Sequence, residues 1–179
     1  MDTSEGTKKY IIKYPEIKSK VLGKTGFTVS ICGFGGYRID NGVLQHQSAL
    51  ELALTSGINL IDTSSNYSDG GSEILVGKVL NKLLTENKID RENVVVVSKG
   101  GYLQGSNLEL AIERENSGKP FTEVVKCGQD LWHCISPDFL ENQITLSLQR
   151  LNLKKIDVYL LHNPEYFLTY SLISDPDRR

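Results

Sequence analysis

The sequence predicts an α/β fold in which helices cover a parallel sheet. Two observations support this prediction. Short apolar runs alternate with segments of helical periodicity, and a connection that passes through a helix joins parallel strands. The run Val94–Val97 consists of four β-branched residues without polar alternation, which is typical of a strand buried on both faces. With 39% hydrophobic residues, a chain of 179 residues is long enough for one such domain.

The order of elements follows from the changes in period. Residues 1–20 are polar and contain several lysines, and we expect them to be an N-terminal extension. Residues 21–30 predict a small hairpin that turns at Lys24-Thr25-Gly26. The expected strands that follow the hairpin are residues 31–36, 58–62, 94–99 and 156–162. The first of these ends in the glycines Gly33, Gly35 and Gly36, which allow a close approach to the backbone.

Three helices are expected between these strands. One covers residues 46–56 and stops at Gly57, one is capped by Ser72, and one begins with Ser136 as its cap and Pro137 in its first turn. Their expected buried stripes are Leu50, Ala53 and Leu54 in the first, Val76, Val79, Leu80 and Leu83 in the second, and Leu140, Ile144, Leu148 and Leu151 in the third. Residues 102–135 mix glycines with charges and predict a long loop, an insertion or a functional segment.

Composition excludes several classes of function. A net charge of -2 gives no electrostatic footprint for nucleic acid or for an anionic membrane. No apolar run approaches the roughly 20 residues that span a bilayer. The first residues contain no basic region followed by an apolar stretch, so we expect no secretory signal. Three cysteines are few and odd in number, which disfavours a disulfide framework. We therefore expect a cytoplasmic protein.

Ionisable side chains stand at the ends of three predicted strands: Asp62, Lys99 and His162. Tyr67 lies five residues after Asp62 in a polar loop. Ligands bind at the carboxyl ends of parallel strands, so this placement predicts a site. Each residue also has a purely structural interpretation: Asp62 as a turn cap, Lys99 as a solvated lysine, and His162 as a hydrogen-bonded core histidine.

The motifs in combination resemble the aldo-keto reductase family over about residues 20–167. They are Gly33-Phe34-Gly35-Gly36-Tyr37, the run Asn59 to Tyr67 with Gly71-Ser72-Glu73 after it, Val97-Ser98-Lys99, and Asp157 to His162. The resemblance implies a (β/α)8 barrel of TIM type. It also implies that this chain holds an incomplete barrel: the N-terminal hairpin plus about the first four βα units in residues 21–167, followed by a polar tail, 168–179.

The family is an NADP(H)-dependent, less often NAD(H)-dependent, class of oxidoreductases that interconvert carbonyls and alcohols. Its Asp-Tyr-Lys-His tetrad matches Asp62, Tyr67, Lys99 and His162, and by resemblance we expect Gly35, Gly36, Tyr37 and Asp62 to contact the cofactor. Carbonyl reduction by hydride leaves negative charge on oxygen, which needs a proton donor. We expect Tyr67 to supply the proton, Lys99 to stabilise the phenolate, Asp62 to hold Lys99, and His162 to hydrogen-bond the carbonyl oxygen.

Other site classes have weaker support. The glycines from Gly33 do not complete the G-x-G-x-x-G fingerprint of a Rossmann fold, because Arg38 stands at its sixth position. Cys127, His133 and Cys134 do not match a common zinc spacing, so no metal is expected. Lys99 at a strand end also fits a Schiff-base aldolase, although such a lysine must be neutral. A regulatory family member that binds nucleotide without turnover is a further alternative.

The chain is shorter than the barrel that it resembles. A (β/α)8 barrel takes about 250 residues, and only residues 163–179 follow the fourth predicted parallel strand. We therefore expect a truncated product without strands five to eight, with two open sheet edges that could let two copies associate. The expected substrate is a small carbonyl compound or alcohol, and no motif selects one among them.

Overall fold

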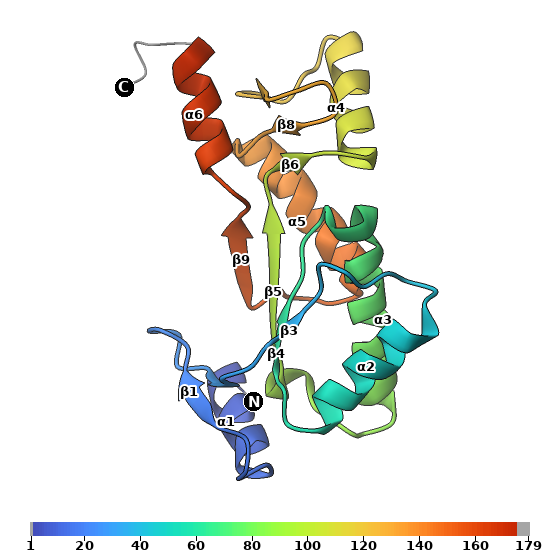
Figure 1. The fold of residues 1–179 in the computed structure, drawn as a ribbon, viewed down its shortest axis with the longest axis vertical. Coiled ribbons are helices and arrows are strands. Elements are labelled where there is room, and N and C mark those ends of the chain that lie inside the picture. The colour runs from blue at the N-terminus through green and yellow to red at the C-terminus, as the bar shows by residue number, and fades with distance from the viewer. Residues whose placement is uncertain (1, 175–179) are drawn as a thin grey trace.

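The centre of the molecule is a four-stranded parallel sheet, as the sequence predicts. The computed structural model describes residues 2–174. The sheet has the order β3 (Phe34–Gly35), β4 (Leu60–Asp62), β5 (Val95–Gly100), β9 (Val158–Leu161), and every neighbouring pair is parallel. Figure 1 shows β5 and β9 side by side, with β3 and β4 beyond β5. Among the described residues, no strand pairs with the outer edge of β9.

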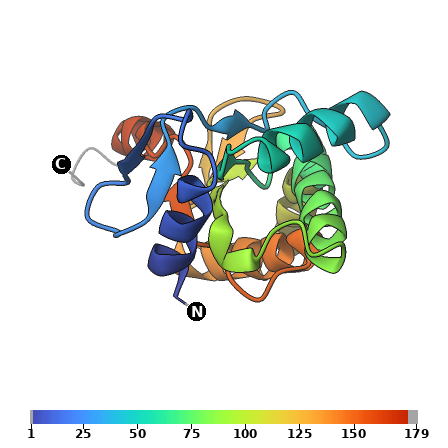
Figure 2. The same cartoon turned by 90° about the horizontal axis from the view of Figure 1, so that it is seen from below.

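The two faces of the sheet belong to different hydrophobic clusters. On one face, Val94 and Val96 pack with Leu50, Leu54 and other side chains of α2 (Leu44–Thr55) and α3 (Gly71–Thr85). On the other face, Val95 and Val97 pack with Val29 and the hairpin. The strand β5 is thus buried on both sides, as its unbroken β-branched run predicts. Viewed from below, α2 and α3 lie on one side of the strands and the hairpin lies on the other (Figure 2).

The predicted hairpin is present. Its strands β1 (Ser19–Val21) and β2 (Thr28–Ser30) pair antiparallel, with Ser19 opposite Ser30. Gly23 and Gly26 in the connection have φ of 53° and 78°, a region that favours glycine. The hairpin therefore covers one side of the sheet.

The N-terminal segment is not a loose extension. Residues Thr3–Ile12 form the helix α1, in which Tyr10 is buried and donates a hydrogen bond from its hydroxyl to the carbonyl of Leu54. Gly6 lies so close to Glu92 that a Cβ would be 2.5 Å from the Glu92 Cβ. This helix has few apolar residues, so a periodicity search misses it; a close glycine contact and one buried tyrosine attach it to the core.

The segment 102–135, predicted as a long loop, is folded. It forms a three-stranded antiparallel sheet and a helix with a hydrophobic cluster of its own. Its elements are β6 (Tyr102–Leu103), α4 (Ser106–Asn116), β7 (Val125–Lys126) and β8 (Trp132–His133). The cluster contains Leu103, Ala111, Phe121 and Cys134 of this segment, together with Phe139 of the helix that follows it. Strands of two residues carry too little periodicity to be found in the sequence.

Three further predictions need correction. Ser72 does not cap α3, because the helix begins at Gly71 after a left-handed Gly70, and the Ser72 hydroxyl instead donates to the carbonyl of Gly36 at 2.9 Å. In α5 (Pro137–Leu151) the buried positions are Phe139, Gln143, Ser147 and Leu151, whereas Ile144 of the predicted stripe is exposed. The expected tail 168–179 begins inside the helix α6 (Glu165–Ser174), and its last five residues lie outside the described part.

The predicted stripe of α3 is confirmed, since Val76, Val79, Leu80 and Leu83 are all buried. In residues 2–174 no helix is long and apolar enough to cross a membrane.

Candidate active site

The predicted site residues meet at one edge of the parallel sheet. Asp62 is the last residue of β4, Lys99 lies near the end of β5, and His162 directly follows β9. Because the three strands are parallel, their carboxyl ends point the same way. Tyr67 reaches the same edge from the 3-10 turn η1 (Tyr67–Gly70), which follows β4.

Lys99 is the centre of the arrangement. Its ammonium donates to Asp62 Oδ2 at 2.7 Å, to the carbonyl of Thr63 at 2.8 Å and to Tyr67 Oη at 3.1 Å. An ammonium has three N–H donors, so all three are used. The Lys99 side chain is only 12% exposed, which limits the screening of its charge by water. The geometry therefore holds a fixed positive charge against the tyrosine hydroxyl.

The turn that contains Tyr67 is tied down on both sides. Ser68 and Asp69 have φ of 49° and 50°, an unfavourable region for residues other than glycine. The Ser68 hydroxyl donates to the carbonyl of Ile39 at 2.9 Å, and the Asp69 carboxylate accepts from the N–H and hydroxyl of Ser106 at 3.1 and 2.8 Å. These bonds hold the left-handed turn, and with it Tyr67, in one place.

His162 completes the group as a neutral imidazole. Burial, together with the nearby Lys99 charge, lowers the pKa of His162 from 6.5 to about 4. Its Nδ1 lies 2.9 Å from Ser64 Oγ, and its ring packs edge-on against Tyr67 with centroids 5.7 Å apart. At neutral pH this side chain is therefore a hydrogen-bonding group without charge.

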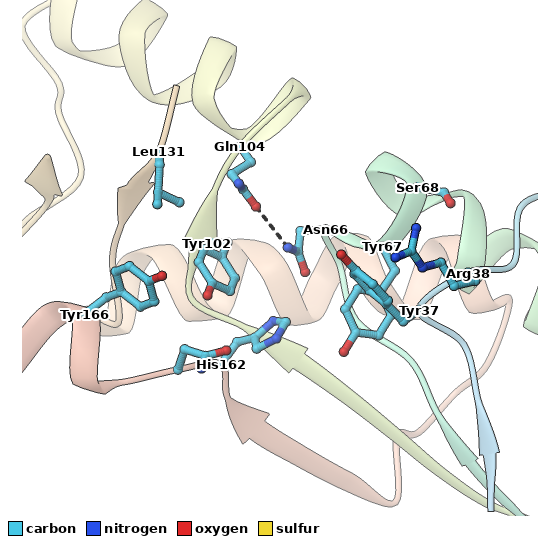
Figure 3. Close-up of a pocket in the computed structure, with 11 residues that line it drawn as sticks. Tyr37, Arg38, Asn66, Tyr67, Ser68, Tyr102, Gln104, Leu131, His162 and Tyr166 are labelled. Carbon is cyan, nitrogen blue, oxygen red and sulfur yellow. Dashed lines mark hydrogen bonds between the residues drawn. The ribbon is translucent and has the colours of Figure 1, made fainter. Parts of the chain in front are cut away.

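A cavity of about 720 Å³ opens in front of these residues (Figure 3). Its lining combines phenols, amides and one imidazole. The lining residues are Tyr37, Arg38, Asn66, Tyr67, Ser68, Tyr102, Gln104, Leu131, His162, Asn163 and Tyr166. Lys99 and Asp62 are not among them: they lie behind Tyr67, and Asp62 borders a second, mainly apolar hollow of about 400 Å³ with Leu60 and Leu160. The tetrad is thus brought together, with its tyrosine and histidine facing the cavity.

The four residues that the resemblance assigns to the cofactor have different environments in the structure. Gly36 is buried, and a Cβ there would lie 2.7 Å from Ser72 Oγ and 2.8 Å from the carbonyl of Asp62, so packing alone requires glycine. Gly35 is exposed and faces open space, and Tyr37 is 62% exposed beside the cavity. The Asp62 carboxylate is 44% exposed, and its Oδ1 has no hydrogen-bond partner within residues 2–174. An open glycine, an exposed ring and an available carboxylate oxygen fit the ribose and nicotinamide of a dinucleotide.

Sequence analysis did not identify several residues that line the cavity or lie directly behind it. Asn66 donates to Gln104 Oε1 at 3.1 Å, and Ser64 bonds to His162. Ser64 and Asn66 stand in the polar loop before Tyr67, and that polarity was the available signal. Gln104 belongs to the segment expected to be a loop, where no pattern marks it.

Comparison with known proteins identifies the family. The model of the aldo/keto reductase family matches residues 33–175, which is most of the chain. The chain therefore belongs to the aldo-keto reductase family, as its motifs predict.

Individual relatives agree with this assignment. The NADH-specific methylglyoxal reductase of Escherichia coli is 35% identical over 154 residues, which cover 82% of this chain and 42% of the relative. The aldo-keto reductase AFTS1 of Alternaria alternata is 32% identical over 158 residues, covering 80% and 40%. The chain thus spans about two fifths of the length of these relatives.

A solved structure shows the same fold. The aldo-keto reductase AKR11C1 from Bacillus halodurans, in its holo form, superposes with a TM-score of 0.61 at 22% identity, covering 89% of this chain and 47% of that one. The four-stranded parallel sheet is accordingly a partial barrel of the TIM type, in agreement with the predicted fold class.

Proposed function

We propose that this site interconverts a small aldehyde or ketone and its alcohol, with Tyr67 as the proton donor in the direction of reduction. The observation that supports this most strongly is the placement of Lys99, whose ammonium lies 3.1 Å from Tyr67 Oη and 2.7 Å from Asp62. A phenol has an ordinary pKa near 10 and gives up its proton reluctantly. A fixed cation beside the hydroxyl stabilises the phenolate that remains after proton transfer.

Each residue then has a definite task. The carbonyl oxygen lies in the cavity between Tyr67 and His162, where negative charge develops on it. Tyr67 donates its proton to that oxygen, Asp62 keeps Lys99 oriented, and His162 donates a hydrogen bond to the same oxygen. One oriented donor of this kind lowers the barrier by about 3 kcal/mol. The three occupied N–H groups of Lys99 disfavour the aldolase alternative, because imine formation needs a free amine.

A nicotinamide cofactor fits the site, with Gly35, Tyr37 and Asp62 as its contacts. When bound, it supplies the hydride. The sequence resemblance favours NADP(H), whereas the Escherichia coli relative is NADH-specific by name. We propose methylglyoxal or a similarly small carbonyl compound as the substrate, in the cytoplasm.

The test measures oxidation of NADH and of NADPH by the full chain, with and without methylglyoxal. Carbonyl-dependent oxidation of either cofactor is expected, and the ratio of the two rates shows which cofactor the protein prefers. Fluorescence quenching of the cofactor without turnover would support a regulatory nucleotide-binding protein instead. If the chain shows neither cofactor binding nor turnover, the proposal is refuted.

We also propose that two copies associate through the open edge of the sheet. Among the described residues no strand pairs with the outer edge of β9, and an unpaired edge favours pairing with another chain. Leu160 and Leu161 of the same strand are also 43% and 47% exposed. Sedimentation equilibrium of the full chain should show a dimer. A monomer across the micromolar range would contradict this part of the proposal.

A further inference from the structure

A chain of hydrogen bonds runs from the imidazole of His162 away from Tyr67. His162 Nδ1 lies 2.9 Å from Ser64 Oγ, Ser64 Oγ lies 2.8 Å from the Asn66 amide, and the Asn66 amide lies 3.1 Å from that of Gln104. Figure 3 shows the last of these bonds at the cavity wall. The chain links the end of β9, the loop after β4, and the residue that follows β6. Ser64 is fully buried, so water does not compete for its hydroxyl.

Each hydrogen bond in this series has a donor and an acceptor. Which group donates at each step decides which nitrogen of His162 carries the proton. A neutral imidazole has one N–H donor and one bare acceptor nitrogen. If the Ser64 hydroxyl donates to Nδ1, then Nε2 carries the proton. If the Ser64 hydroxyl donates instead to Asn66, or to the carbonyl of Lys99 at 3.3 Å, Nδ1 must carry the proton and Nε2 is bare. Since a carbonyl oxygen only accepts hydrogen bonds, only the first arrangement lets Nε2 bind it.

Both directions fit the same distances. The oxygen and the nitrogen of a side-chain amide occupy nearly equivalent positions. Rotating the Asn66 and Gln104 amides by half a turn therefore exchanges donor and acceptor in every hydrogen bond of the series. Figure 3 draws the Asn66 nitrogen toward Gln104. After the half turn, Gln104 donates to Asn66, Asn66 donates to Ser64, and Ser64 donates to His162 Nδ1.

We propose that Ser64 is a positioning residue that fixes His162 as the tautomer with the proton on Nε2, with Asn66 and Gln104 supplying the hydrogen bonds that make the Ser64 hydroxyl a donor. The role of this tautomer in catalysis rests on the proposed carbonyl reduction. The tautomer itself does not, because it is a property of the protein without ligand. Because burial and Lys99 lower the pKa of His162, the imidazole remains neutral over the range in which the tautomer matters.

The test is the two-bond proton–nitrogen NMR spectrum of the histidine rings in the full-length, nitrogen-15-labelled chain at pH 7. The sequence has three histidines, and the His162→Gln variant assigns the signals of His162 by their loss. The wild-type spectrum should show a protonated Nε2 and a bare Nδ1. The Ser64→Ala variant should change the tautomer ratio roughly fivefold, the equivalent of one ordinary hydrogen bond.

The Asn66→Asp variant provides the sharpest test. A carboxylate at this position can only accept hydrogen bonds, so the Ser64 hydroxyl must donate to it and Nδ1 must take the proton. The spectrum should therefore switch to the opposite tautomer, although the Ser64 side chain that hydrogen-bonds to the imidazole has not changed. Ser65→Ala is the matched control: Ser65 is also buried, and its hydroxyl makes no hydrogen bond in the part of the chain that the structure describes. Its spectrum should equal that of the wild type.

A wild-type chain with the proton on Nδ1, or an Asn66→Asp variant with an unchanged tautomer, would overturn the inference. Circular dichroism of each variant confirms that it folds. The spectra need no cofactor or carbonyl compound, so they are independent of turnover. A chain with the expected tautomers but no reductase activity would refute the proposed function alone, and an active chain with unchanged tautomers would refute the inference alone.

Discussion

Replacing Glu73 with glutamine should destabilise the fold by about 3 kcal/mol. Glu73 is fully buried; one carboxylate oxygen accepts from Ser98 Oγ and the other from Arg150 Nε, both at 2.6 Å. The Glu73→Gln side chain keeps one oxygen that accepts from Arg150 Nε, and its N–H can donate to Ser98 Oγ, because a hydroxyl also accepts. The main loss is therefore the counter-charge of Arg150. Removing one partner of a buried ion pair costs about 3–5 kcal/mol. The lower end applies because the Arg150 side chain is 20% exposed.

The assay is equilibrium unfolding of the full chain in urea, followed by circular dichroism. The control is Glu113→Gln, which changes an exposed glutamate of α4 and should alter the unfolding free energy by less than about 0.5 kcal/mol. A double variant, Glu73→Gln with Arg150→Met, should be less destabilised than the sum of the single changes, because it removes the unpaired charge. A loss below about 1 kcal/mol for Glu73→Gln would refute the reasoning, since it is far below the cost expected for a buried guanidinium that loses its counter-charge.

Three further outcomes are expected. The unfolded chain binds a proton at the imidazole near its ordinary pKa of 6.5 and the folded chain only near 4, so the wild-type unfolding free energy should fall by up to about 3 kcal/mol between pH 6.5 and 4. His162→Gln should flatten that slope, and a parallel slope in titrations of both proteins would contradict the assigned cause. Lys99→Met should lower kcat for carbonyl reduction by about 100-fold, the equivalent of about 3 kcal/mol, and steady-state kinetics with an unchanged kcat would argue against its role. Leu161→Lys should convert the expected dimer into a monomer by sedimentation equilibrium, and a persisting dimer would place the interface elsewhere.

The parallel sheet was predictable because its signals are local and strong. The run Val94–Val97 has no polar residue, and all but its first residue lie in β5, the strand with both faces buried. The stripe of α3 was equally clear, since apolar residues recur there at helical spacing and all four predicted positions are buried. Where the hydrophobic pattern and the tertiary packing agree, the sequence suffices.

The third predicted helix was oriented incorrectly because its buried face is partly polar. Gln143 is fully buried and exchanges two hydrogen bonds with Asn107, at 3.0 and 2.9 Å. Ser147 is also buried, while the apolar Ile144 is 37% exposed. A pattern of hydrophobicity cannot identify a buried amide pair, because the partner lies 36 residues away in α4.

The candidate site also contains residues that the sequence predicts and residues that only tertiary contacts identify. The strand ends locate Asp62, Lys99 and His162 at one edge, and the family motif adds Tyr67. Ser64 and Gln104 were missed, since their roles depend on contacts between segments far apart in the chain: Ser64 meets a histidine 98 residues later. The assignment of Gly36 to the cofactor rests on resemblance, while the structure shows a packing reason for that glycine.

The most direct test of the proposed chemistry removes one oxygen atom. In Tyr67→Phe the ring remains and the hydroxyl that receives the Lys99 hydrogen bond is lost. With saturating cofactor and methylglyoxal, kcat/KM should fall by a factor of about 100 to 10,000, the usual contribution of a general acid. Tyr14→Phe, which removes a hydroxyl bonded to Thr55 remote from the cavity, should retain wild-type turnover. A Tyr67→Phe variant as active as the wild type would contradict the assignment of Tyr67 as the acid.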